Sequence, residues 1–219
     1  MTKHFLHQTE HLKKKILHLT ALVEDNMRNA VRSVTELNRE LAERVVEADV
    51  EIDAYEVEIE EDCLKTLALY QPVAIDLRFI VAVLKINNDL ERIGDLATNI
   101  AHRTNSLYRH KDERVPFDMG RMLAKTMAMV QESADALVGS DVKIAQKVLK
   151  DDQEIDQLHH DAYAQLQAEI KKNPELVEYY ISLLSVSRNL ERIADHATNI
   201  AEDVIYMVEG EIIRHGNGL

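Results

Sequence analysis

Acidic residues spaced four positions apart recur along this chain, and their type and spacing could do chemistry. Glu91 and Asp95 form one pair, and Glu191 and Asp195 form a second pair one hundred residues further on. Residues four apart share one face of an α-helix, so each pair places two carboxylates side by side. Like charges at this spacing weakly destabilise a helix, and an asparagine continues each row. Such rows of oxygen atoms indicate a cation-binding site.

Two simpler interpretations of these rows stay open. Most polar rows on a helix are a solvated face, and the spacing places each row almost opposite the apolar stripe of its own helix. Arg92 and Arg192 are also neighbours of the rows and are able to pair with the carboxylates. The spacing alone therefore leaves solvent, arginine and metal as alternative partners.

A further polar row precedes each pair and favours the metal hypothesis. In the first half the row borders an apolar face and consists of Asp49, Asp53, Glu56 and Glu60. In the second half the matching positions are Asp152, Asp156, His159 and Tyr163. Carboxylates beside an apolar face must be solvated, protonated, paired or metal-bound. Hard oxygen ligands on two helices suit Mg, Ca, Mn or Fe, whereas His159 is interpreted as a polar boundary residue.

Catalytic arrangements are not found in the sequence. A ferritin-like di-iron site needs Glu-x-x-His pairs from two helices, and the nearest match is a single Asp156-x-x-His159. There is no glycine-rich phosphate loop and no Ser/His/Asp or Cys/His set. The one cysteine, Cys63, continues an apolar row and is expected to be a small buried hydrophobe. We therefore expect a protein that is not an enzyme.

The helices that carry these rows belong to an internal duplication. Residues 90–101 read LERIGDLATNIA and residues 190–201 read LERIADHATNIA, identical at ten of twelve positions. The differences are Gly94/Ala194 and Leu96/His196, and the first of them suggests a close backbone contact. Each copy also contains an apolar stripe at spacings of three and four, typical of a core-facing helix. The duplicated unit is about half the chain.

Each half is predicted to form three helices. Apolar spacing predicts first helices over about 12–41 and 117–148, and second helices over about 49–68 and 152–170, with Asp49 and Asp152 as N-caps. Third helices begin near Val73 and Glu175, after a proline that interrupts the helical pattern. The charged stretch 109–116 is interpreted as a linker, and the tail 214–219 as frayed. The prediction is an all-α protein of two tandem, homologous three-helix bundles, spanning 1–110 and 115–219.

Charge and hydropathy restrict the partners and the location. The chain has 26 basic and 39 acidic side chains, a formal net charge of −13, which repels nucleic acid and anionic lipid. The N-terminal residues lack the apolar stretch of a signal peptide, and the longest dense apolar run, 79–84, is far shorter than the roughly 20 residues of a membrane span. We expect a soluble cytoplasmic protein with no direct membrane insertion.

Three segments of the chain resemble the PhoU family of phosphate-signalling regulators. They are YQPVAIDLR at 70–78, DLERIGD at 89–95 and RNLERIADHATNIAEDVIY at 188–206. The resemblance spans nearly the whole chain and implies two similar three-helix bundles. It also implies a regulator of phosphate uptake that represses the phosphate-starvation two-component response when phosphate is plentiful. The implied partners are the importer ATPase and the phosphate sensor histidine kinase, with a tendency to form a homodimer.

The same resemblance implies metal clusters held by E(D)-x-x-x-D motifs. The matching residues are Asp49, Asp53, Glu91, Asp95, Asp152, Asp156, Glu191 and Asp195. The candidate ions are Fe, Zn, Mg, Mn and Ca. Two other hypotheses stay open beside the regulator: a carboxylate-rich metal-binding or metal-storage protein, and a plain helical scaffold with a different partner.

Overall fold

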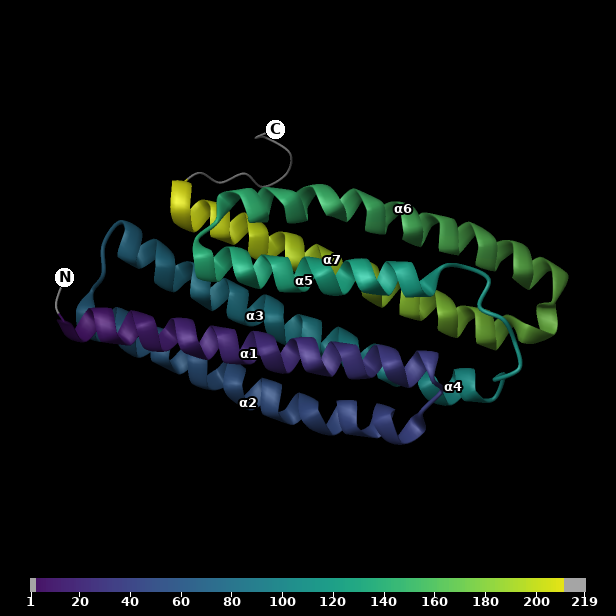
Figure 1. Ribbon diagram of the computed structural model, residues 1–219. Coiled ribbons are helices and arrows are strands. Elements are labelled where there is room, and N and C mark those ends of the chain that lie inside the picture. Colours follow the sequence, from purple (N-terminus) through teal and green to yellow (C-terminus); the bar gives the residue numbers. More distant parts are fainter. Residues whose placement is uncertain (1–2, 211–219) are drawn as a thin grey trace.

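The computed structural model describes residues 3–210, and in this part of the chain the regular elements are all helical. The elements are α1 (Lys3–Thr35), α2 (Arg39–Tyr70), α3 (Ile75–Ala101), the short α4 (Thr104–Tyr108), α5 (Met119–Gly139), α6 (Val142–Lys172), a 3₁₀ turn (Pro174–Leu176) and α7 (Val177–Glu209). Helices α1, α2 and α3 form one bundle, and α5, α6 and α7 form the other (Figure 1). The predicted fold class, two tandem homologous three-helix bundles, is confirmed.

The two bundles join lengthwise through α3 and α7, with a second contact between α1 and α5. Figure 1 shows the long helices lying side by side, so that the molecule is elongated along their common direction. The predicted core stripes of α3 and α7 are confirmed, because Ile86, Leu90, Ile93, Leu190 and Ile193 are all buried. One apolar core therefore extends through both bundles.

The helix boundaries in the first half differ from the prediction. Apolar residues continue at helical spacing past residue 35, yet α1 ends there and Leu37 adopts a left-handed φ of 52°. Asn38 caps α2 by accepting a hydrogen bond from the backbone N–H of Leu41 at 3.0 Å. The predicted N-cap at Asp49 is wrong, because α2 is already ten residues long at that point. The apolar period crosses the turn because both helices turn their apolar faces to the same core.

The second half repeats this difference. Helix α5 ends at Gly139, and Asp141 caps α6 by accepting hydrogen bonds from the N–H groups of Lys143 and Ile144. Asp152 is therefore an interior residue of α6 and not its cap. Both second helices start about ten residues earlier than predicted, so the acidic residues 49 and 152 lie inside long helices.

The predicted starts of the third helices are close to the observed ones, at Ile75 and Val177. The linker 109–116 lies between α4 and α5 outside any helix. The domain limits 1–110 and 115–219 stay a prediction, and the tail 214–219 lies outside the described residues. In the described part of the chain, no helix has the length and apolar content that a membrane crossing requires.

Candidate functional site

The first carboxylate cluster, defined as Asp49, Asp53, Glu91 and Asp95, lies where α2 packs against α3. Gly94 brings the two helices together at this point. A Cβ atom on Gly94 would come within 3.1 Å of Asp49 Oδ1 and 3.3 Å of Ile52 Cγ2. The glycine therefore leaves the space that the Asp49 carboxylate occupies, which confirms the close contact suggested by the Gly94/Ala194 difference.

Burial and mutual repulsion make the first cluster an unfavourable place for negative charge. Burial raises the pKa of the Asp49 carboxyl, and the neighbouring Asp53 raises this pKa further. Burial also raises the pKa of Glu91, with Asp95 as the next cause. Both effects disfavour the ionised carboxylates. A cation bound among them would offset this cost, so the first cluster favours cation binding.

An arginine already occupies part of the first cluster. Arg92 donates from Nη1 to Asp95 Oδ2 at 2.9 Å, and Arg92 Nε lies 3.2 Å from Glu91 Oε2. Pairing with Arg92, one of the alternatives left open by the sequence, is therefore observed. Arg92 is half exposed, so the pairing contributes little net stability and can be displaced.

The second carboxylate cluster, defined as Asp152, Asp156, Glu191 and Asp195, occupies the matching position between α6 and α7. Burial raises the pKa of Asp152 to about 6, and the three other carboxylates of the cluster add to the shift. Burial is also the largest cause of the raised pKa of Glu191 and of Asp195. Among the described residues, no side-chain nitrogen forms an ion pair with any of the four carboxylates, in contrast to the first cluster.

The side chains of both clusters have the chemistry that a metal ion requires, but their carboxylates do not converge on one point. One oxygen atom each of Asp49 and Asp152 is buried and accepts no hydrogen bond, as expected of a group that binds a cation, whereas the buried Glu91 Oε2 already lies 3.2 Å from Arg92 Nε. Carboxylate oxygens are also the ligands that hard cations prefer. However, within residues 3–210 no three His, Cys, Asp or Glu side chains converge closely enough to hold a metal ion. Side-chain rotation would be needed, and the eight predicted ligands stay a prediction.

The acidic pair on α3 is less exposed than predicted. The Glu91 side chain is only 19% exposed and that of Asp95 is 43% exposed, so the row borders the core and does not lie opposite it. The reason is that α3 is packed against α1, α2 and α7 together, which leaves little of its circumference for solvent. A solvated polar face is therefore not what the first pair forms.

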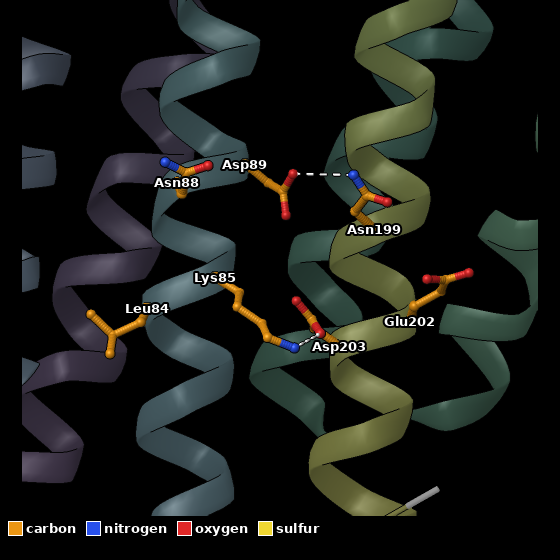
Figure 2. Close-up of a pocket in the computed structure, with 7 residues that line it drawn as sticks. All are labelled: Leu84, Lys85, Asn88, Asp89, Asn199, Glu202 and Asp203. Carbon is orange, nitrogen blue, oxygen red and sulfur yellow. Dashed lines mark hydrogen bonds and ion pairs between the residues drawn. The ribbon is translucent and has the colours of Figure 1, made fainter. Parts of the chain in front are cut away.

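The asparagine that continues the second row has a different role from the one predicted. Asn199 donates to Asp89 Oδ1 at 3.3 Å, across the contact between α7 and α3 (Figure 2). His196 Nδ1 lies 2.7 Å from the same oxygen. Asp89 thus joins the two bundles and is not part of either carboxylate cluster.

The residues at this inter-bundle contact line a polar cleft of about 570 Å³. They are Leu84, Lys85, Asn88, Asp89, Asn199, Glu202 and Asp203. Figure 2 shows Lys85 reaching from α3 to Asp203 on α7, with the Lys85 Nζ to Asp203 Oδ1 distance at 2.8 Å. Sequence reasoning missed this contact. The available signal was the Leu96/His196 difference, because a position that changes between two otherwise matching copies can mark where the copies meet.

The third members of the two upstream rows, Glu56 and His159, make hydrogen bonds at matching positions. Asn87 Nδ2 donates to Glu56 Oε1 at 3.1 Å in the first half, and His159 Nδ1 lies 2.8 Å from Ser187 Oγ in the second. Burial lowers the pKa of His159, so this ring is neutral at neutral pH. His159 is a polar boundary residue, as predicted.

Two side chains with nucleophilic potential, Ser187 and Cys63, are buried inside the protein. Ser187 is fully buried, and its hydroxyl also contacts Met122 Sδ at 3.4 Å. Cys63 is likewise buried, and burial raises its pKa to about 12, which keeps the thiol protonated and inert. The expected buried Cys63 is confirmed, and neither group can reach a substrate.

Comparison with known proteins identifies similar chains. A family model described as the PhoU domain matches residues 16–104 and again residues 119–204. A protein of Aquifex aeolicus named "Phosphate-specific transport system accessory protein PhoU homolog" is 37% identical over 208 residues, covering 95% of this chain and 94% of its own. The "PhoU homolog 1" of Thermotoga maritima is 34% identical over 212 residues, covering 95% and 90% of the two chains.

Two solved structures share the architecture. The crystal structure of PhoU from Pseudomonas aeruginosa superposes with a TM-score of 0.90 at 34% identity, covering 94% of this chain and all of the other. The phosphate transport system regulatory protein PhoU from Streptococcus pneumoniae gives a TM-score of 0.87 at 27% identity, with 95% and 98% coverage. The likeness therefore extends over both bundles.

Proposed function

This chain belongs to the PhoU family, and on that premise we propose that it is a non-enzymatic regulator of phosphate uptake. The observation that carries the proposal is the match of the PhoU domain model to each of the two bundles. The relatives with the same arrangement, covered almost from end to end, are named phosphate-specific transport system accessory proteins. The buried positions of Ser187 and Cys63 support a role that involves no covalent chemistry.

In detail, the protein represses the phosphate-starvation two-component response when phosphate is plentiful, by contacting the importer ATPase and the sensor histidine kinase. It acts in the cytoplasm, where both contacts are available, and associates as a homodimer. An elongated scaffold with one continuous core supports such an adaptor role, since it presents long helix faces to separate partners. Its net charge of −13 favours basic surfaces on those partners.

Deletion and pull-down together test this proposal. In phosphate-replete cells, the tagged chain is expected to recover the importer ATPase and the sensor kinase, and deletion is expected to switch on phosphate-starvation genes. A matched culture starved of phosphate is the control, because repression should already be absent there. Unchanged transcription in the deletion strain, with neither partner recovered, would contradict the proposal.

A second candidate function, metal binding by the two carboxylate clusters, has support of its own. Buried carboxylate oxygens without a hydrogen-bond partner or an ion pair occur in both clusters, at Asp49 and at Asp152. Residues Asp49, Asp53, Glu91 and Asp95 would hold the ion in the first cluster, and Asp152, Asp156, Glu191 and Asp195 in the second. A bound Fe, Zn, Mg, Mn or Ca ion would neutralise the repulsion within each cluster. The chain holds the two helices of each cluster close enough for their carboxylates to bind the same ion.

Elemental analysis distinguishes metal binding from a bare acidic surface. Protein purified without chelator is expected to retain metal, and Asp95→Ala and Asp195→Ala are each expected to reduce the bound amount. Glu61→Ala is a matched control, because Glu61 is an exposed acid of α2 that pairs with Lys65. No retained metal, together with normal repression in both cluster variants, would leave the clusters without this function.

A further inference from the structure

The connection between α2 and α3 exposes a group of apolar side chains at one end of the molecule. We define the α2–α3 tip as residues 69–77. Its large apolar side chains and their exposed fractions are Leu69 75%, Tyr70 36%, Val73 73%, Ile75 56% and Leu77 41%. Figure 1 shows this connection at the end of the molecule where the described part of α1 begins. Contiguous exposed apolar groups of this kind mark interaction sites.

The second half of the chain shows that the fold does not require such a tip. The matching connection between α6 and α7 runs through Lys171, Lys172, Asn173 and Pro174. Its Leu176 packs against the core, and the exposed large apolar side chains next to it are Val177 and Ile181, two against the five of the tip. Since both connections join equivalent helices, the apolar surface of the first is not needed for folding.

The α2–α3 tip also contains a strained backbone position at Ala74. Ala74 has φ 51° and ψ −120°, a region that side chains other than glycine rarely adopt. Backbone hydrogen bonds hold the chain on both sides of the connection, from Gln71 N–H to Leu67 O at 3.1 Å and from Arg78 N–H to Ala74 O at 3.1 Å. A surface fixed in advance loses little conformational freedom on binding.

Charge argues that the occupant is not an anionic membrane. Between residues 64 and 80 the basic residues are Lys65 and Arg78. Lys65 pairs with Glu61 at 3.0 Å, and the Arg78 guanidinium lies against Gly210, where its Cζ is 3.4 Å from the position of an added Cβ. The acidic Asp76 stands inside the tip itself. Helix α1 borders the tip through the contact of Phe5 with Tyr70, and its Lys13 and Lys15 are paired with Glu10 and with Glu58 and Asp62. Little free basic charge is therefore available to attract an anionic lipid surface.

Size argues that the occupant is not a second copy bound through this surface alone. A stable protein interface buries about 800 Å² per partner and uses roughly 20–30 residues on each side. The tip has only nine residues, too few for such an interface on its own. A small, rigid, apolar projection instead suits a transient contact in a concave surface.

We infer that the α2–α3 tip inserts into an apolar cleft, rimmed by neutral or basic residues, on a partner protein. The inference rests on the proposed function, whose importer ATPase and sensor kinase are the proteins to test. Val73 and Leu69 are the main anchors, because they expose the largest fractions of their side chains. The acidic Asp76 matches a basic rim.

The test is a binding measurement with full-length chains. The purified importer ATPase and the cytoplasmic part of the sensor kinase are immobilised separately, and wild type is compared with the double variant Leu69→Ser/Val73→Ser. The matched control is Val177→Ser/Ile181→Ser, which removes two exposed apolar side chains at the start of α7. All four positions are exposed, so each variant is expected to fold, as circular dichroism will check.

The tip variant is expected to bind at least one partner more than 10-fold more weakly than wild type, while the control variant stays within 2-fold. Equal binding by wild type and the tip variant would overturn the inference and leave the proposed function intact. Binding of wild type to neither protein would overturn both. Two other results would also overturn the inference, if the tip variant still bound its partners as wild type does. One is tip-dependent binding to vesicles of phosphatidylcholine and phosphatidylglycerol, and the other is tip-dependent dimerisation in sedimentation.

Discussion

Replacement of Asp152 by asparagine is expected to stabilise the protein once metal has been removed. In the folded chain, burial raises the pKa of Asp152 from 3.8 to about 6, and its three cluster neighbours add to the shift. The folded state therefore prefers the protonated acid. The contribution of protonated Asp152 to the free energy of unfolding is fully present below pH 3.8, and it is lost as the pH rises through about 6. Above that pH, the ionised carboxylate opposes folding.

The magnitude follows from the size of the shift. Each pKa unit corresponds to about 1.4 kcal/mol, so the shift sets an upper limit of about 3 kcal/mol. Asp152 is only half buried and solvent screens its charge, which reduces the expected effect to about 1–2 kcal/mol. An asparagine side chain would keep the shape of the aspartate and remove its charge. Asp152→Asn should therefore raise the free energy of unfolding near pH 7.5 by that amount and have little effect at pH 4.

Urea unfolding followed by circular dichroism in the presence of a chelator measures this effect. Wild type, Asp152→Asn and the control Asp151→Asn are compared at pH 4, 5, 6 and 7.5. Asp151 lies one position away on α6 and pairs with Lys147 at 3.4 Å, so its loss should bring no stabilisation. If Asp152→Asn is less stable than wild type at pH 7.5, or has the same pH dependence, burial of this charge is not what opposes folding.

Three further predictions concern other parts of the molecule. Asn26 is 3% exposed and both polar atoms of its side chain lack a protein partner, so Asn26→Leu should raise the free energy of unfolding by about 1–3 kcal/mol in urea titrations. Arg92→Gln should tighten Mn²⁺ binding, measured calorimetrically, because it frees Asp95, whereas Arg192→Gln should not. Ala194→Gly should lower the free energy of unfolding by about 1 kcal/mol in the same urea assay, since glycine lowers helix stability. An unchanged or increased free energy of unfolding would contradict this prediction.

Local periodicity explains which parts of the fold could be predicted. The core stripe through Ile86, Leu90 and Ile93 follows from spacings of three and four, and each of these residues is buried. Periodicity could not place the turn at Leu37, because the apolar pattern continues across it into the next helix. The caps at Asn38 and Asp141 carry the expected chemistry, but the aspartates about ten residues later, Asp49 and Asp152, have equal capping propensity.

The duplication, the all-helical class and the two helix pairs that carry the acidic rows follow from the amino-acid sequence alone, because they depend on residues close together in the chain. The environment of those rows follows only from the tertiary structure. Packing of α3 against three helices leaves the Glu91 side chain only 19% exposed, and the contact between α3 and α7 turns Asn199 toward Asp89, more than one hundred residues away. The burial that raises the pKa of Asp152, and the exposure of the α2–α3 tip, likewise depend on which helices surround each residue. Long-range packing sets these properties, and no local pattern encodes it.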